Sequence, residues 1–162
     1  MSHRVGLGFD IHRLEADSAS GAGVSLGGVR VPCPWRMVAH SDGDVVLHAL
    51  CDALLGAVAA GDLGEHFPDS DPAHRGRDSA WFLATVLALP QLAAWRLVNL
   101  DVNIIAETPR LMAHKPEIRA RVGALLGLPA EAVSIKARSH EGVDAIGEKR
   151  AIAAQAVVLL ET

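Results

Sequence analysis

A helical segment that is apolar on almost every side constrains the fold of this chain most strongly. Residues Asp44–Ala60 are nearly all apolar, and a helix of this kind must be buried over most of its surface. The exceptions are Asp44, His48 and Asp52, which recur at helical spacing and therefore form one polar stripe. A polar stripe ordinarily faces solvent. The alternative is a functional face, on which Asp44 or Asp52 orients the ring of His48.

The rest of the chain predicts a sheet against which this helix packs. In Leu97–Ala106, apolar residues alternate with Asn and Asp, which is typical of a strand with one buried face. The other expected strands are Arg4–Ile11, Val24–Val31, Val133–Arg138 and Ala151–Leu160, and the other expected helices are Ser79–Leu89 and Pro116–Leu126. Asp42 or Ser41 is expected to cap the helix that starts at Asp44. Strands separated by helices indicate an α/β or α+β fold, a single domain over residues 1–162 with helices packed on one β-sheet.

Charge and cysteine usage exclude several classes of function. The net charge is −4 and there is no large cluster of Lys or Arg, so a nucleic-acid partner is not expected. No apolar run is long enough to span a membrane, and no signal-peptide pattern is visible at the N-terminus. Cys33 and Cys51 are expected to be free thiols in a reducing compartment. These features predict a cytoplasmic protein that binds neither nucleic acid nor membrane.

Asp10, His12 and His48 indicate a metal site. Asp10 and His12 close the apolar run that begins at Val5, and side chains two apart on a strand share a face. His48 can add a third ligand from the helix. Three ligands of Asp and His type with an open fourth position are typical of catalytic zinc. Taken singly, each motif fits a chance pattern or a core histidine better, but together they favour the metal site.

Several loops offer groups suited to a phosphorylated polyol. His40 and Ser41 precede the helix, whose first backbone N–H groups are expected to attract a phosphate. Asp62 and Asp69 lie in a turn-rich loop and are candidates to accept hydrogen bonds from hydroxyl groups, although such acids usually cap turns.

Two further loops follow the third and fourth expected strands. Arg110 offers a cation, the hydroxyl of Ser139 a donor to phosphate, and Glu141 a ligand for a second hard cation. As single residues, Arg110 and Glu141 fit ordinary solvated charges. No motif for a protein nucleophile is present, so the pattern favours electrostatic catalysis in which the substrate or water attacks.

These segments, in this order, resemble the 2-C-methyl-D-erythritol 2,4-cyclodiphosphate synthases over essentially the whole chain. The matching motifs are Gly8-Phe9-Asp10-Ile11-His12, His40-Ser41-Asp42-Gly43-Asp44 with Leu47-His48-Ala49-Leu50, Asp52–Ala57, Gly61-Asp62-Leu63-Gly64 with Phe67–Pro72, Asn99–Val102 and Ala154–Val157. The resemblance implies a homotrimer with active sites between adjacent subunits. It also implies a phosphorus–oxygen lyase of non-mevalonate isoprenoid biosynthesis. In this reaction, the 2-phosphate of 4-diphosphocytidyl-2-C-methyl-D-erythritol 2-phosphate attacks the β-phosphate and CMP leaves.

The resemblance also implies roles for individual residues. Zinc would be held by Asp10, His12 and His48, a magnesium or manganese ion by Glu141, and the transition state would be stabilised by His40 and Ser139. Asp62 and Gly64 would contact the ribose, Asp69 the methylerythritol, and the backbone of Ala106–Met112 the cytosine. The full implied substrate-binding set is Asp10, His12, His40, Ser41, Asp62, Leu63, Gly64, Phe67, Asp69, Asp71, Ala106, Pro109, Arg110, Leu111, Met112, Arg138, Ser139 and Glu141.

The chain departs from the family pattern in three places. Arg110 stands where lysine is more usual, and Arg138-Ser139-His140-Glu141 replaces a threonine-rich version. Ala145 and Glu148 stand where many members have phenylalanine and arginine lining an axial channel, so weak binding of isoprenoid diphosphates is expected. Two rival functions are a metal-dependent phosphohydrolase, with His40 as the base, and a non-catalytic trimeric module that binds isoprenoid diphosphates.

Overall fold

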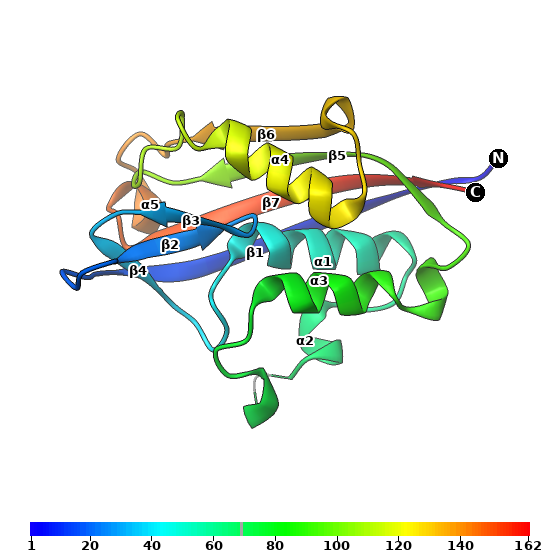
Figure 1. Cartoon of the computed structure of the whole chain (residues 1–162), viewed down its shortest axis with the longest axis horizontal. Helices are drawn as coiled ribbons and strands as arrows, with labels where there is room; N and C mark the ends of the chain where they lie inside the picture. Colours follow the sequence, from blue (N-terminus) through cyan, green and yellow to red (C-terminus); the bar gives the residue numbers. More distant parts are fainter. Residues whose placement is uncertain (69) are drawn as a thin grey trace.

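A long antiparallel pair formed by the two ends of the chain organises the structure (Figure 1). The computed structural model describes residues 1–68 and 70–162. Strand β1 (His3–Ala16) pairs along most of its length with the last strand, β7 (Ala151–Glu161). The N- and C-termini therefore lie side by side at one end of the sheet.

The described elements confirm the predicted α+β domain. The other strands are β2 (Gly23–Leu26), β3 (Val29–Pro32), β4 (Trp35–Val38), β5 (Arg96–Ile105) and β6 (Val133–Arg138). The helices are α1 (Val45–Ala57), α2 (Leu63–His66), α3 (Ser79–Leu87), α4 (Lys115–Leu126) and α5 (Asp144–Gly147), with short 3-10 turns at Pro72–His74, Pro90–Leu92 and Ala130–Ala132. None of the described helices is long and apolar enough to cross a membrane.

The main sheet has the strand order β4-β1-β7-β5-β6. All neighbours are antiparallel except β5 and β6, which are parallel and are joined through α4. Helix α1 packs against β1 and β7, α4 packs against β6, and α3 packs against α1 (Figure 1). The buried helix predicted from its apolar composition is thus the centre of the core, between the sheet and a further helix.

The expected strand Val24–Val31 was wrong, because the chain turns back in its middle. Gly27 and Gly28 both have positive φ, 62° and 76°, and they form the two-residue turn of the β2–β3 hairpin. This hairpin is a separate two-stranded sheet. Strand β4 was not expected either. It pairs with the distal part of β1, beyond the predicted end of that strand.

The start of α1 is capped by Asp44, so the expectation that Asp42 or Ser41 caps it was wrong. The Asp44 carboxylate is fully buried and accepts hydrogen bonds from the backbone N–H groups of Val46 at 3.1 Å and Leu47 at 3.0 Å. The same carboxylate accepts from the hairpin turn, at 2.8 Å from Gly27 N and 2.7 Å from Gly28 N. One side chain therefore joins the helix start to the β2–β3 turn.

Two glycines allow α1 to lie unusually close to β1. A Cβ on Gly6 would lie 1.7 Å from the carbonyl oxygen of Ala53, and a Cβ on Gly8 would lie 1.9 Å from that of Ala49. Both contacts are with helix backbone, which cannot move aside as a side chain can. Because alternate residues of a strand share a face, the same spacing directs the next even positions of β1 toward α1.

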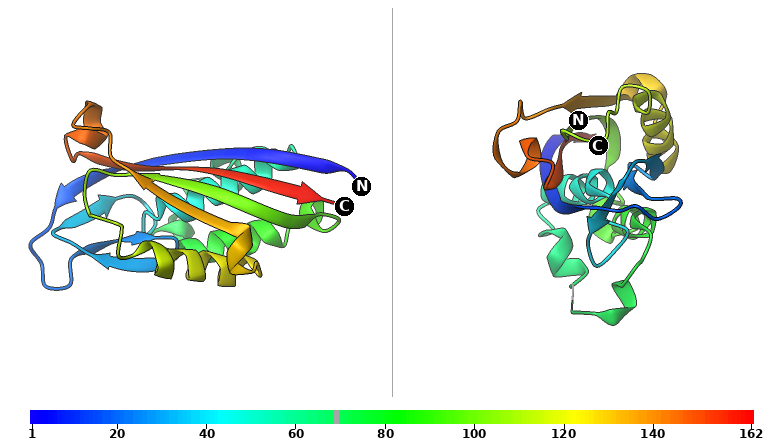
Figure 2. Two further views of the ribbon diagram at one scale, coloured as in Figure 1. Left: turned by 90° about the horizontal axis from the view of Figure 1, so that it is seen from above. Right: turned by 90° about the vertical axis from the view of Figure 1, so that its left-hand side faces the viewer.

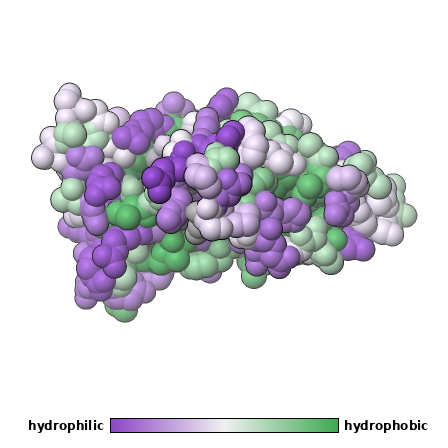
Figure 3. Space-filling view, turned by 90° about the horizontal axis from the view of Figure 1, so that it is seen from below, coloured by the Kyte–Doolittle hydropathy of each residue, from purple (hydrophilic) through white to green (hydrophobic). Residues whose placement is uncertain are grey.

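The other face of the sheet is open over most of its length. Among the described helices, the short α5 packs on one end of it, where Ile146 clusters with Ala151 and Ala153 of β7. Viewed from above, β1, β7, β5 and β6 are otherwise uncovered (Figure 2). The exposed large apolar residues on this face are Val5, Leu7, Phe9 and Ile11 of β1 and Val157 of β7. The opposite side of the molecule, seen from below, has hydrophilic and hydrophobic residues intermixed on its surface (Figure 3). On the open sheet face, by contrast, exposed apolar side chains form a row on adjacent strands, which is typical of a surface that binds another protein.

Candidate metal centre and active site

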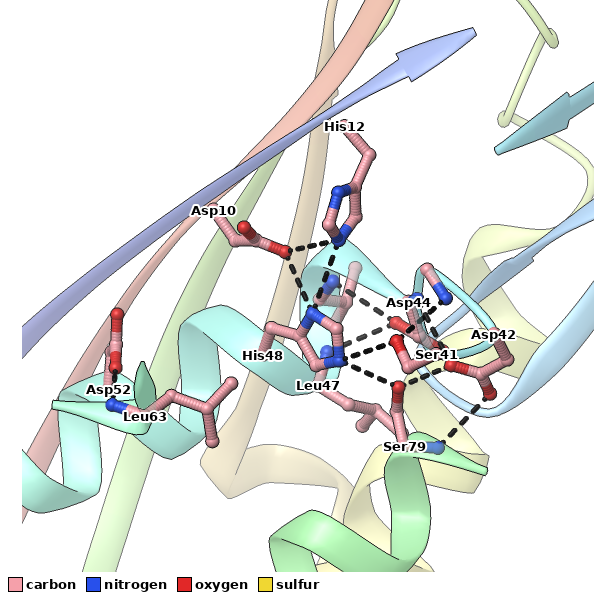
Figure 4. Close-up of polar contacts among 12 residues, drawn as sticks. Asp10, His12, Ser41, Asp42, Asp44, Leu47, His48, Asp52, Leu63 and Ser79 are labelled. Atoms are coloured by element: carbon pink, nitrogen blue, oxygen red, sulfur yellow. Dashed lines mark hydrogen bonds and ion pairs between the residues drawn. The ribbon is translucent and has the colours of Figure 1, made fainter. Parts of the chain in front are cut away.

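Asp10, His12 and His48 converge between β1 and α1 (Figure 4). Asp10 Oδ2 lies 3.0 Å from His48 Nδ1 and 3.1 Å from His12 Nε2, and the two ring nitrogens are 3.3 Å apart. In a tetrahedral shell, ligand atoms about 2.0–2.1 Å from zinc lie roughly 3.3 Å from one another. The separations match those of a tetrahedral divalent-metal site, so the predicted convergence of these three side chains into a cluster able to hold a divalent metal is confirmed.

Charge within the cluster favours an ionised Asp10. Burial alone would raise the pKa of its carboxyl group, but hydrogen bonds and charge from His12 and His48 outweigh burial and hold the pKa below its usual range. Burial alone would lower the pKa of His48, but its hydrogen bond to Asp10, together with the negative charges of Asp10, Asp44 and Asp42, outweighs burial and raises that pKa. A carboxylate and two imidazoles can together bind a divalent cation, which then takes the place of the protons that these groups would otherwise hold.

The second ring nitrogen of His48 contacts serines, not the carboxylates of the polar stripe. Nε2 lies 2.9 Å from Ser79 Oγ and 3.3 Å from Ser41 Oγ (Figure 4). Ser79 in turn donates from its hydroxyl to Asp42. The expectation that Asp44 or Asp52 orients the His48 ring was therefore wrong.

Each member of the α1 polar stripe has a different task. Asp44 caps the helix, His48 faces the metal cluster, and Asp52 accepts a hydrogen bond from Leu63 N at 2.8 Å, at the start of α2. Because the Asp44 carboxylate occupies the N–H groups of Val46 and Leu47, the phosphate expected at this helix end lacks those donors. Of the groups expected to attract a phosphate here, His40 and Ser41 remain on the cavity wall.

A cavity of about 530 Å³ opens beside the metal cluster. Among the residues predicted for the substrate, it brings together Asp10, His12, His40, Ser41, Leu63, Gly64 and Phe67. Asp52, predicted only as a partner of the His48 ring, also lines the cavity, and the lining residues that sequence reasoning did not predict for the site are Val38, Ala39, His74 and Phe82. Ala39 adjoins His40 in the chain, but no spacing rule indicates His74 or Phe82.

An aromatic wall forms one side of this cavity. The ring centroids of Phe67 and Phe82 are 5.0 Å apart, and the His74 ring lies 5.6 Å from each of them, all with edge-to-face geometry. Edge-to-face packing is the arrangement aromatic rings prefer, and it holds the wall rigid. The cavity thus combines a polar metal-binding side with an apolar side.

Two predicted acids of the intervening loop, Asp62 and Asp71, cap short helical turns. Asp62 is the N-cap of α2, at 2.9 Å from Glu65 N, and Asp71 caps the next turn, at 2.9 Å from Ala73 N. Neither lines the cavity as described. Asp69 lies outside the described residues.

The remaining predicted residues form a second group beyond β5 and β6. Ala106 N donates to Arg138 O at 2.8 Å, which joins the two loops, and Ser139 Oγ lies 2.9 Å from Glu141 Oε1. Pro109, Arg110, Leu111 and Met112 follow in the first of these loops. In the sheet, β6 is separated from β1 by β7 and β5, which amounts to three strand spacings or roughly 14 Å. In the described part of this single chain, the lining of the cavity beside Asp10 does not include this group.

A family model described as the YgbB family matches residues 3–161 of this chain. The chain belongs to the YgbB family. Its relatives include the 2-C-methyl-D-erythritol 2,4-cyclodiphosphate synthase of Alcanivorax borkumensis, which is 48% identical over 162 residues and is matched over 100% of this chain and 99% of that protein. The enzyme of the same name from Syntrophomonas wolfei is 44% identical over 158 residues, with 98% of each chain covered.

A solved structure of a YgbB-type protein has the same fold. The CDP complex of IspF from Plasmodium falciparum superposes with a TM-score of 0.83 at 32% identity, covering 98% of this chain and 95% of that chain. The resemblance to the cyclodiphosphate synthases is therefore confirmed along the whole chain. The YgbB match spans residues 3–161 and therefore includes both groups of predicted site residues.

Proposed function

We propose that this YgbB-family protein converts 4-diphosphocytidyl-2-C-methyl-D-erythritol 2-phosphate to 2-C-methyl-D-erythritol 2,4-cyclodiphosphate and CMP. It would be a lyase of non-mevalonate isoprenoid biosynthesis. The observation that carries the proposal is the Asp10, His12 and His48 cluster at the edge of a cavity, in a chain that aligns end to end with synthases of this name. The bound CDP of the P. falciparum structure supports a cytidine nucleotide as ligand.

The reaction requires no protein nucleophile. An oxygen of the 2-phosphate attacks the β-phosphorus, the bond from that phosphorus to the bridging oxygen of the α-phosphate breaks, and CMP leaves with that oxygen. The protein's task is to hold the two phosphates in line and to stabilise the charge that builds on them. His40 and Ser41, on the cavity wall beside the cluster, are placed to donate to phosphate oxygens.

Zinc is the proposed ion at Asp10, His12 and His48, where it would act as a Lewis acid on a phosphoryl oxygen. The chain supplies one carboxylate and two imidazoles, and these three side chains line the cavity, so substrate would have access to an ion held there. A magnesium or manganese ion is proposed at Glu141, whose carboxylate is exposed beside Ser139.

We propose the remaining roles for residues near the cavity and for the loops that follow β5 and β6. His40 and Ser139 would stabilise the transition state, Asp62 and Gly64 would contact the ribose, and Asp69 the methylerythritol. The backbone of Ala106–Met112 would hold the cytosine. We also propose a cytoplasmic location, supported by the free thiols of Cys33 and Cys51.

We further propose a homotrimer whose active sites lie between subunits. The residues proposed for one reaction fall into two groups at separate places on one chain, so a complete site needs a group from each of two copies. The open sheet face with Val5, Leu7, Phe9 and Ile11 supports such an assembly, because association would bury it.

A direct assay tests the function. The purified protein is incubated with the cytidylated substrate, zinc and magnesium, and the products are identified by mass spectrometry. We expect CMP and the cyclic diphosphate in equal amounts. CMP with the uncyclised 2,4-bisphosphate, formed when water attacks the β-phosphorus, would instead indicate the phosphohydrolase, and no turnover together with diphosphate binding would indicate a non-catalytic module.

Mixing two inactive variants tests the shared site. We expect Ser139→Ala to lose about 10²-fold in rate, as for removal of one transition-state donor, and His48→Ala to lose more. In trimers reassembled from equal amounts of both, about one quarter of the interfaces would carry both intact residues, so CMP release should recover to a comparable fraction of the wild-type rate. A preparation of the double variant mixed with itself is the control. No recovery in verified mixed trimers would contradict a site shared between subunits.

A separate prediction concerns isoprenoid diphosphates at the proposed trimer axis. Glu148 accepts a hydrogen bond from Arg150 Nε at 2.7 Å, so the guanidinium of Arg150 is already paired with a carboxylate. Symmetry-related carboxylates close to the axis would repel a diphosphate. We expect geranyl diphosphate to give no saturable binding by calorimetry, and Glu148→Arg to gain binding. Tight binding by the unmodified chain would refute this prediction.

A further inference from the structure

We propose that Ser79 and Asp42 form a positioning pair that holds the proton of His48 on Nε2 and so keeps Nδ1 free to bind the metal. The inference rests on the metal site of the proposed function, because it assigns work to residues behind a ligand. Neither Ser79 nor Asp42 lines the cavity as described, so neither is placed to contact substrate there. Their effect would pass through the His48 ring.

The pair consists of a buried serine and a half-buried aspartate that are bonded to each other. Ser79 is the first residue of α3 and is fully buried. Its backbone N–H donates to Asp42 Oδ2 at 3.1 Å, and its hydroxyl donates to Asp42 Oδ1. The backbone N–H of Asp44 adds a third donor at 3.3 Å from Asp42 Oδ1. Asp42 is thereby held in place by donors from two segments of the chain.

The direction of these hydrogen bonds determines where the His48 proton lies. An ionised carboxylate can only accept, so the single hydroxyl proton of Ser79 is directed to Asp42. A lone pair of Ser79 Oγ then faces His48 Nε2 at 2.9 Å, and the bond forms only when Nε2 carries the proton. A neutral imidazole with its proton on Nε2 has its lone pair on Nδ1, which is the atom 3.0 Å from Asp10 Oδ2 in the metal cluster.

Ser41 also contacts His48 Nε2, but it does not determine which ring nitrogen carries the proton. Its Oγ lies farther from His48 Nε2, at 3.3 Å, and it also accepts from Gly43 N at 3.1 Å. In the part of the chain that the structure describes, no carboxylate is recorded as accepting the Ser41 hydroxyl proton, so its direction is not imposed. The Ser79 and Asp42 pair is therefore the element that selects the ring nitrogen for the metal.

Zinc affinity of the full-length protein, measured by competition with a chromophoric chelator, tests the proposal without substrate. We expect Ser79→Ala to weaken zinc binding about 10- to 100-fold, the usual effect of losing a group that orients a metal ligand. Ser79→Thr keeps the hydroxyl and should restore most of the affinity. Thr85→Ala is the matched control on the same helix, because its hydroxyl bonds only to Trp81 O, at 2.8 Å, and zinc affinity should not change.

Nitrogen chemical shifts of the histidine rings, measured by NMR, show which ring nitrogen carries the proton and which binds the metal. These shifts would not change if Ser79 and Asp42 had only a structural role. In the zinc-loaded wild type we expect the His48 proton on Nε2 and the metal on Nδ1. Asp42→Asn, which can present an amide donor to Ser79, should weaken this preference and lower zinc affinity in the same direction. Unchanged affinity and Nδ1 ligation in both Ser79→Ala and Asp42→Asn would overturn the positioning role while leaving the metal site intact. Failure of the wild type itself to bind zinc through His48 would instead refute the metal site.

Discussion

Replacing His48 with alanine is expected to abolish zinc binding at the cluster and, with it, CMP release. The substitution removes one of three protein ligands, and the remaining pair, Asp10 and His12, cannot complete a catalytic site of this type. A bound metal ion contributes several kcal/mol of charge stabilisation, so the rate should fall by about 10³-fold or more. Zinc content of the purified protein and CMP release measure the two effects separately.

The fold should survive this change. Alanine favours helix, and we expect the free energy of unfolding of the metal-free protein to change by no more than about 2 kcal/mol, within the usual range of point substitutions. His3→Ala is a matched control, since His3 is an exposed histidine at the start of the strand that carries Asp10. Full zinc occupancy in folded His48→Ala protein would show that the ion binds elsewhere.

Replacing Gly8 with alanine should destabilise the fold by about 3 kcal/mol or more, beyond the usual cost of overpacking a core. The new Cβ would lie 1.9 Å from the carbonyl oxygen of Ala49 and 2.7 Å from the backbone N of Ala53. Relief requires β1 and α1 to separate, but β1 is held by β7 along most of its length and by β4 at its distal end. The same separation would pull Asp10 away from His48. Denaturant unfolding at a fixed protein concentration measures the loss.

Gly56→Ala is the matched control for this experiment. Gly56 lies within α1, and a Cβ added there would lie 3.8 Å from Leu7 O, an ordinary contact distance. Because alanine has a higher helix propensity than glycine, this variant should be at least as stable as wild type, with a gain in the free energy of unfolding of up to about 1 kcal/mol. A Gly8→Ala protein with wild-type stability would mean that the helix does not need to approach the strand so closely.

Much of the fold was predictable because local pattern and tertiary role agree. The alternation in Leu97–Ala106 predicts β5 to within one residue at each end, since one face of that strand is buried and the other is not. Val24–Val31 failed for the opposite reason. Its apolar residues lie on two short strands that both pack inward, and the only sign of the turn was Gly27 followed by Gly28.

The metal ligands could be predicted because their chemistry is visible in residue type and spacing. Asp10 and His12 are two apart on one strand, and His48 is an isolated imidazole on an apolar helix, so few other arrangements explain them. The orientation of His48 could not be predicted in this way. Ser79 lies 31 residues away in the chain, and only the packing of α3 against α1 brings its hydroxyl to the ring.

Sequence alone determined the residues of the candidate metal cluster, the buried helix and most strands, because these depend on residue chemistry and on periodicity within single segments. Only the tertiary structure decided that Asp44 caps α1 and that His74 and Phe82 line the cavity. It also decided that Ser139 and Glu141 lie three strands away from Asp10. Strand order and contacts between segments distant in sequence depend on how the whole chain packs, and no local pattern of residues records that packing.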